Sequence, residues 1–82
     1  MSQTTLDVVD LLGQIENDDS VPKNIRIRVR NAINILEGQG KASAVKFDKA
    51  IEELDFISDD TNLPTYTRTQ IWHIVSLLES SK

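Results

Sequence analysis

Two segments of this 82-residue chain decide the expected fold: ENDDSVPKNIRIRVRNAINILE at residues 16–37 and SDDTNLPTYTRTQIWHIVSLLE at residues 58–79. They align at an offset of 42 residues with five identities, whereas roughly one would be expected by chance at average composition. The identical pairs are Asp18 and Asp60, Pro22 and Pro64, Arg26 and Arg68, Leu36 and Leu78, and Glu37 and Glu79. A repeat of this period predicts a duplicated helical unit, and the alternative is a pair of unrelated amphipathic hairpins.

Apolar residues recur at helical spacing in four stretches, which predicts two helical hairpins. The residues expected on the buried stripes are Val8, Leu11, Leu12 and Ile15; Ile25, Val29, Ala32, Ile33 and Leu36; Ala44, Phe47, Ala50, Ile51, Leu54 and Ile57; and Ile71, Ile74, Val75 and Leu78. Short connections between them favour an antiparallel arrangement. We therefore expect one all-α domain over 1–82, a four-helix bundle with pseudo-repeats at about 5–37 and 43–80.

The turn residues mark where the second helix begins and ends. Pro22 suits the first turn of a helix, where its missing N–H costs nothing, and Ser20 or Val21 would then be the cap. Gly38 and Gly40 favour the end of that helix, because glycine readily takes the left-handed conformation there.

Composition excludes several classes of protein. The sequence has no Cys, which excludes disulfide scaffolds and cysteine-based zinc sites and gives no support to an oxidising compartment. No run of apolar residues is longer than two, which is too short for a transmembrane helix or the apolar part of a signal peptide. We therefore expect a cytoplasmic protein that does not act on membranes.

The most specific resemblance lies at residues 64–75, where the spacing is Pro-x-x-x-Arg-x-x-Ile-Trp-x-Ile-Val. Together with DDSVPKNIR at 18–26, this segment resembles the archaeal uncharacterised protein family 0147 over nearly the whole chain. The resemblance implies a compact helical bundle from an archaeal cytoplasm, and it implies no activity or functional residue. Both halves of the repeat share an Asp, a Pro, an Arg and then an apolar stripe, and this pattern is similar to the second helix of HEAT-type repeats. Because two such units cannot form a solenoid with stable ends, closure into a bundle or pairing with a second chain is expected.

Positive charge is concentrated between Lys23 and Lys49, where seven Lys or Arg residues stand against two acids in a chain of net charge −4. On a helix, Lys23, Arg26 and Arg30 share one flank, whereas Arg28 points to the other side. This candidate basic patch predicts phosphate contacts in an accessory nucleic-acid-binding or ribonucleoprotein-binding protein. The alternative is a solvated face that pairs with neighbouring acids, for which Asp10, Glu16, Glu52 and Glu53 are candidates. The acidic net charge and the lack of interleaved aromatic residues favour the structural alternative.

Other polar features indicate structure rather than chemistry. The spacing shared by Asp18 with Arg26 and by Asp60 with Arg68 predicts ion pairs or braces of the two turns. His73 lacks the Glu-x-x-His spacing of di-metal bundles. The sequential Glu52 and Glu53 point to different sides of a helix, and GQGK at 38–41 lacks the second half of a nucleotide-binding motif. We therefore predict no catalytic residue, metal or cofactor.

Several large apolar residues fall outside the predicted stripes. Val45, Phe56 and Trp72 form the candidate partner surface, and Ile27, Ile35 and Leu77 also lie at or beyond the stripe edges. Grouped on one surface, such residues would make an interface. The leading hypothesis is a non-enzymatic protein-interaction module that binds a protein partner or a second copy of itself, with no small-molecule substrate.

Overall fold

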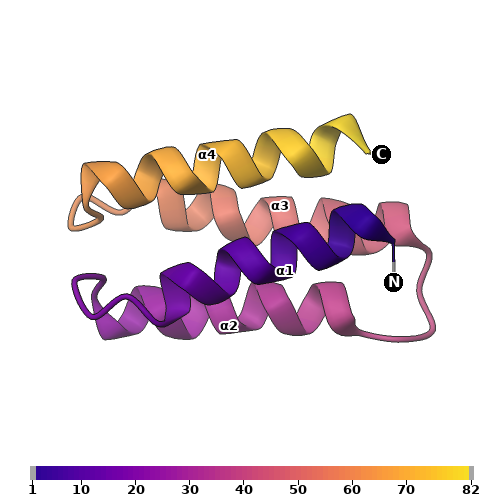
Figure 1. The fold of residues 1–82 in the computed structure, drawn as a ribbon, viewed down its shortest axis with the longest axis horizontal. Helices are drawn as coiled ribbons and strands as arrows, with labels where there is room; N and C mark the ends of the chain where they lie inside the picture. Colours follow the sequence, from indigo (N-terminus) through magenta and orange to yellow (C-terminus); the bar gives the residue numbers. More distant parts are fainter. Residues whose placement is uncertain (1, 82) are drawn as a thin grey trace.

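The computed structural model describes residues 2–81, which form four α-helices and no strand. The helices are α1 (Gln3–Glu16), α2 (Lys23–Glu37), α3 (Ser43–Ser58) and α4 (Thr65–Ser80). Successive helices run in opposite directions. The turns after α1 and α3 therefore lie at one end of the molecule, and the α2–α3 connection lies at the other end with both chain ends (Figure 1). The predicted all-α fold with antiparallel helices is confirmed.

The four helices form a closed ring. Each is adjacent to two others, in the pairs α1–α2, α2–α3, α3–α4 and α4–α1, and the backbones of the diagonal pairs lie further apart. The hydroxyls of Thr4 and Ser81 lie 3.0 Å apart across the α4–α1 closure. Because the last helix returns to the first, both hairpins bury their apolar stripes against one another in a bundle of 33 × 20 × 18 Å.

The core contains almost every residue that the periodicity predicts. The fully buried side chains are those of Val8, Leu12, Ile15, Ile25, Val29, Leu36, Leu54, Ile57, Ile71 and Leu78, among others. The prediction is wrong for Ala44, which is exposed because it lies in the first turn of α3, before Phe47, the first buried residue of that helix. Leu11 and Val75 are half-buried and pack against the core from its edge.

The predicted helix caps are partly wrong. Pro22 occupies the cap position itself, with φ −55°, and its carbonyl accepts the N–H of Arg26 at 3.1 Å. Ser20 does not cap α2, because its hydroxyl donates to the Asp18 carboxylate at 2.7 Å. Gly38 ends α2 in an extended conformation, and within residues 2–81 only Gly40 takes the left-handed conformation, with φ +85°.

The two turns at the same end of the bundle share one geometry. The N–H of Val21 donates to the carbonyl of Asp18 at 3.1 Å, and that of Leu63 donates to the carbonyl of Asp60 at 3.2 Å. Val21 and Leu63 are both buried, so each turn inserts one apolar side chain under the ends of its helices. These equivalences fall at the offset of 42 residues, and the duplication itself stays a prediction.

Thr67 supplies a test of the packing. Its side chain is buried, and its hydroxyl has no hydrogen-bond partner among the described residues. We expect Thr67→Val to raise the free energy of unfolding by about 1 kcal/mol, because an unpaired buried hydroxyl costs desolvation energy and valine keeps the shape. Urea unfolding measures the change.

Thr5 is the matched control, because it is also buried but its hydroxyl lies 2.9 Å from that of Ser2. We expect Thr5→Val to lower the free energy of unfolding. Equal losses in the two variants would contradict this description of the Thr67 hydroxyl.

Candidate functional site

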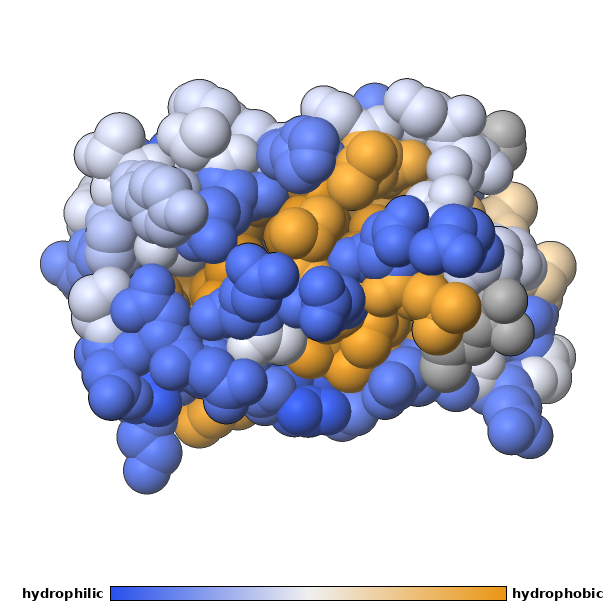
Figure 2. Space-filling model, in the orientation of Figure 1, coloured by the Kyte–Doolittle hydropathy of each residue, from blue (hydrophilic) through white to orange (hydrophobic). Residues whose placement is uncertain are grey.

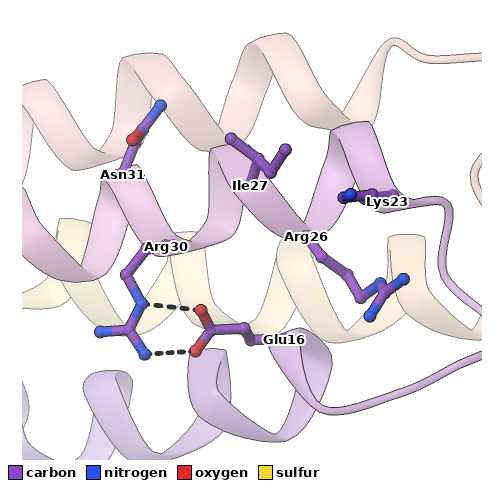
Figure 3. A pocket seen from close by; sticks show the side chains of 6 residues that line it. All are labelled: Glu16, Lys23, Arg26, Ile27, Arg30 and Asn31. Carbon is purple, nitrogen blue, oxygen red and sulfur yellow. Dashed lines mark hydrogen bonds and ion pairs between the residues drawn. The ribbon is translucent and has the colours of Figure 1, made fainter.

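The predicted basic patch is divided between two sides of α2. Lys23, Arg26 and Arg30 line a groove of about 290 Å³ beside α1, whose walls also include Glu16, Ile27 and Asn31 (Figure 3). Arg28 lies on the other side, against α3. The division follows from helical spacing, and it agrees with the predicted separation of Arg28 from the other three.

Arg30 is paired with α1. Its Nε donates to one carboxylate oxygen of Glu16 at 2.7 Å and its Nη2 donates to the other, the two-point geometry drawn in Figure 3. These hydrogen bonds hold the pKa of Arg30 above its usual value. This pairing is the one expected if the basic patch is a solvated helix face that pairs with neighbouring acids.

Arg26 braces the turn between α1 and α2. Its side chain extends towards that turn, and its Nε donates to the carbonyl of Val21 at 3.0 Å (Figure 3). Arg68 does the same in the second half, where it donates to the carbonyls of Ser58 at 3.1 Å and Asp60 at 2.9 Å. The predicted turn brace is therefore confirmed.

The predicted ion pairs of these arginines with Asp18 and Asp60 are wrong, because both guanidinium groups bond backbone carbonyls. Asp18 instead accepts the hydroxyl of Ser20 at 2.7 Å and its N–H at 2.9 Å. These two bonds, with a smaller contribution from the charge of Arg26, lower the pKa of the Asp18 carboxyl. Asp60 accepts the N–H of Asn62 at 2.8 Å.

Arg28 joins α2 to α3 through two contacts. Its Nη1 lies 3.2 Å from the Oε1 of Glu53, and its guanidinium carbon lies 4.1 Å from the centre of the Phe56 ring. Such stacking combines a cation–π attraction with packing of the planar guanidinium on the ring. We call Arg28, Glu53 and Phe56 the Arg28 cluster.

The candidate partner residues are exposed but do not form one patch. The exposed fractions are 44% for Val45, 60% for Phe56 and 57% for Trp72. Phe56 lies towards α2, because Arg28 covers it from there, whereas Trp72 belongs to α4, which is diagonal to α2 in the ring. The three residues therefore present at least two separate surfaces.

Two other exposed apolar residues were not predicted from the sequence. Tyr66 is 72% exposed in the first turn of α4, and Leu6 is 50% exposed on α1. Helical spacing could have placed Tyr66 outside the buried stripe that contains Ile71, and Leu6 outside the one that contains Val8.

Figure 2 shows apolar surface in the middle of the face formed by α1 and α4, crossed by hydrophilic side chains.

A second basic cluster was also missed as a site. Lys41, Lys46 and Lys49 line one pocket with Asn34 and Gln39, at the end of the bundle where α2 connects to α3. The excess of Lys and Arg between residues 23 and 49 was the available signal. It could not show that these three lysines converge, because Lys41 lies in a connection whose path helical spacing does not predict.

Within residues 2–81, no group of three or more His, Cys, Asp or Glu side chains is placed to hold a metal ion. His73 is exposed on α4. None of the helices described is long and apolar enough to cross a membrane.

Comparison with known proteins shows the family. Residues 2–81 match the model of an uncharacterised protein family, UPF0147. A UPF0147 protein of Saccharolobus islandicus strain L.S.2.15 is 47% identical over 90% of this chain and 83% of its own length. The UPF0147 protein of Methanocaldococcus jannaschii is 46% identical over 88% of this chain and 77% of its own length.

A solved structure has the same fold. The crystal structure of the unknown function protein MMP1188 superposes with a TM-score of 0.93 at 43% identity, over 96% of this chain and 90% of that one. The family resemblance that the segments at 18–26 and 64–75 carry is therefore confirmed. This chain belongs to the uncharacterised protein family UPF0147.

Proposed function

We propose that this protein is a non-enzymatic interaction module that binds another protein through exposed aromatic side chains. The observation that carries the proposal is the placement of its four aromatic residues. Phe47 alone is in the core, and Phe56, Tyr66 and Trp72 are each more than half exposed. Exposing large apolar side chains forgoes the stabilisation that burial would provide, and aromatic residues are enriched at the energetic centres of protein interfaces.

Phe56 is the anchor that we assign to the partner site. Arg28 stacks on its ring and pairs with Glu53, so three side chains from two helices hold one another in place. A side chain that is already ordered loses less conformational entropy when a partner covers it. Arginine and aromatic residues are also the types that dominate binding energy at interfaces.

The composition of the core supports a non-enzymatic role. The buried polar residues in the described part of the chain are Thr5 and Thr67, and neither ionises near neutral pH. The pKa values of catalytic acids, bases and nucleophiles are commonly shifted by burial beside a charge.

The cytoplasmic location expected from the sequence stays a prediction, as does self-association.

The nucleic-acid alternative rests on Lys23, Arg26, Arg28 and Arg30. Three of these four donate to acceptors of the chain itself: Arg26 to a carbonyl, Arg28 to Glu53 and Arg30 to Glu16. Phosphate contacts would have to compete with those bonds. The engagement of the arginines therefore favours the protein-interaction proposal over this alternative.

A double-mutant cycle tests whether Arg28 holds Phe56. We expect the Arg28→Met and Phe56→Leu substitutions to be non-additive in the free energy of unfolding by about 0.5–1 kcal/mol, because a stacked cation–π pair at an exposed site contributes that much. Urea unfolding of the two single variants and the double variant measures the coupling. Additive losses would mean that the two side chains do not support each other in solution.

Binding itself is tested in two steps. The tagged protein is first used to isolate a partner from archaeal cytosol in high salt. The purified partner is then titrated with the wild type and with Phe56→Ser. We expect Phe56→Ser to weaken binding about thirty-fold, the effect of removing an interface anchor worth about 2 kcal/mol.

Leu6→Ser is the matched control. Leu6 is also about half exposed, but it lies on α1, which is diagonal to α3 in the ring. We expect this variant to bind within two-fold of the wild type. Equal losses in the two variants, or full binding by Phe56→Ser, would overturn the assignment of Phe56. Recovery of nucleic acid that is lost at high salt would favour the alternative function.

A further inference from the structure

A pocket of about 330 Å³ lies where α2 ends and α3 begins. Its cationic side chains are Lys41 from the connection between these helices and Lys46 and Lys49 from α3. Asn34, Ile35, Gly38 and Gln39 complete the lining, and no carboxylate is among the residues that form it. The pocket therefore gathers three positive charges in a chain whose net charge is −4.

Lys46 is held at the edge of this pocket. Its Nζ donates to the carbonyl of Gly38 at 3.0 Å, at the carboxyl end of α2. Carbonyls at the end of a helix carry partial negative charge, which favours a cation there. The same bond fixes Lys46 beside the connection that carries Lys41. An ammonium group that is already positioned loses less entropy when it binds an anion.

Lys41 and Lys49 lie close enough to perturb each other. The pKa of Lys41 is lowered, first by a side-chain hydrogen bond with Lys49 and then by repulsion between the two positive charges. A neutral amine can accept a hydrogen bond from the neighbouring ammonium, whereas two ammonium groups only repel. Bringing these lysines together is therefore unfavourable in the free protein.

Unlike these lysines, two arginines of α2 each have a carboxylate partner. Arg28 lies beside Glu53, and Arg30 lies beside Glu16. In the described part of the chain, no ion pair within 4.0 Å involves the three pocket lysines. A bound anion of more than one charge would supply the missing countercharge and offset the repulsion between Lys41 and Lys49.

We propose that the pocket of Lys41, Lys46 and Lys49 binds the phosphate group of a small ligand. The ammonium groups neutralise its charge, and the lining residues Asn34 and Gln39 carry side-chain amides, which can donate hydrogen bonds to its oxygens. The small volume of the pocket favours a compact ligand over a nucleic-acid strand, and the negative charge of the whole chain repels long polyanions. This site is separate from the Arg28 cluster and goes beyond the proposed protein interaction.

Titration with inorganic diphosphate tests the proposal. The ¹⁵N-labelled protein is titrated at constant low ionic strength, with chloride as the reference anion. We expect saturable shifts of the backbone signals of residues 34–49 with diphosphate and none with chloride. We expect Lys49→Gln to raise the dissociation constant at least about five-fold, because it removes one close charge from the site.

Lys23→Gln is the matched control, since it makes the same change of net charge at a position on α2 outside the pocket. We expect it to change the dissociation constant less than two-fold. Equal weakening by both variants would show attraction by overall charge and would overturn the proposal. Shifts that do not saturate, or that spread evenly over the molecule, would overturn it too.

The ionisation of Lys41 gives a second readout. We expect diphosphate to raise the pKa of Lys41, measured from its ¹³Cε signal, and Lys49→Gln to raise it without ligand. A Lys41 pKa that does not respond to diphosphate would contradict binding between these lysines. A short oligonucleotide provides the last comparison: tighter binding of it at this pocket than of diphosphate would overturn the assignment to a small ligand.

Discussion

The packing of α4 against α1 closes the helices into a ring, and the rest of the structure depends on this closure. Without it, α1 and α4 would each have one neighbour, and part of both apolar stripes would face water. With it, the side chains of Val8, Leu12, Ile71 and Leu78 are fully buried in a chain of only 82 residues. Closure also determines what remains outside. Once four stripes meet in one core, the aromatic side chains that point away from it have no place inside, and they are available to a partner.

Much of this fold could be predicted because each helix carries its pattern locally. The spacing of Ile25, Val29 and Leu36 predicts their burial, and the prolines at 22 and 64 mark where α2 and α4 begin. Details that depend on neighbours could not be predicted in the same way. Ala44 has stripe spacing but lies before the first covered residue of its helix. The spacing of Arg26 and Arg68 from the turn aspartates left ion pairs and turn braces as alternatives, and the structure shows braces that end on backbone carbonyls.

The candidate sites were harder to predict, because each depends on which helices are adjacent and how each is rotated. The spacing within α2 places Arg28 apart from Arg30, but it does not show that Arg28 will lie over Phe56 of α3. The convergence of Lys41 with Lys49 depends on the path of residues 38–42 between two helices. These arrangements follow from tertiary packing, on which a one-dimensional pattern carries little information. The two sites lie along the same α2–α3 side of the bundle, and each uses its own set of side chains.

The most direct test of this account compares the one buried aromatic residue with an exposed one. The core is complete without Trp72, which is 57% exposed, and depends on Phe47, which is 3% exposed. Urea unfolding of Phe47→Ala and Trp72→Ala gives the loss of unfolding free energy at each position. We expect a loss of about 3–5 kcal/mol for Phe47→Ala and of about 1 kcal/mol or less for Trp72→Ala. Losses of similar size would show that Trp72 stabilises the fold, and would contradict the claim that the exposed aromatic side chains are kept for a partner.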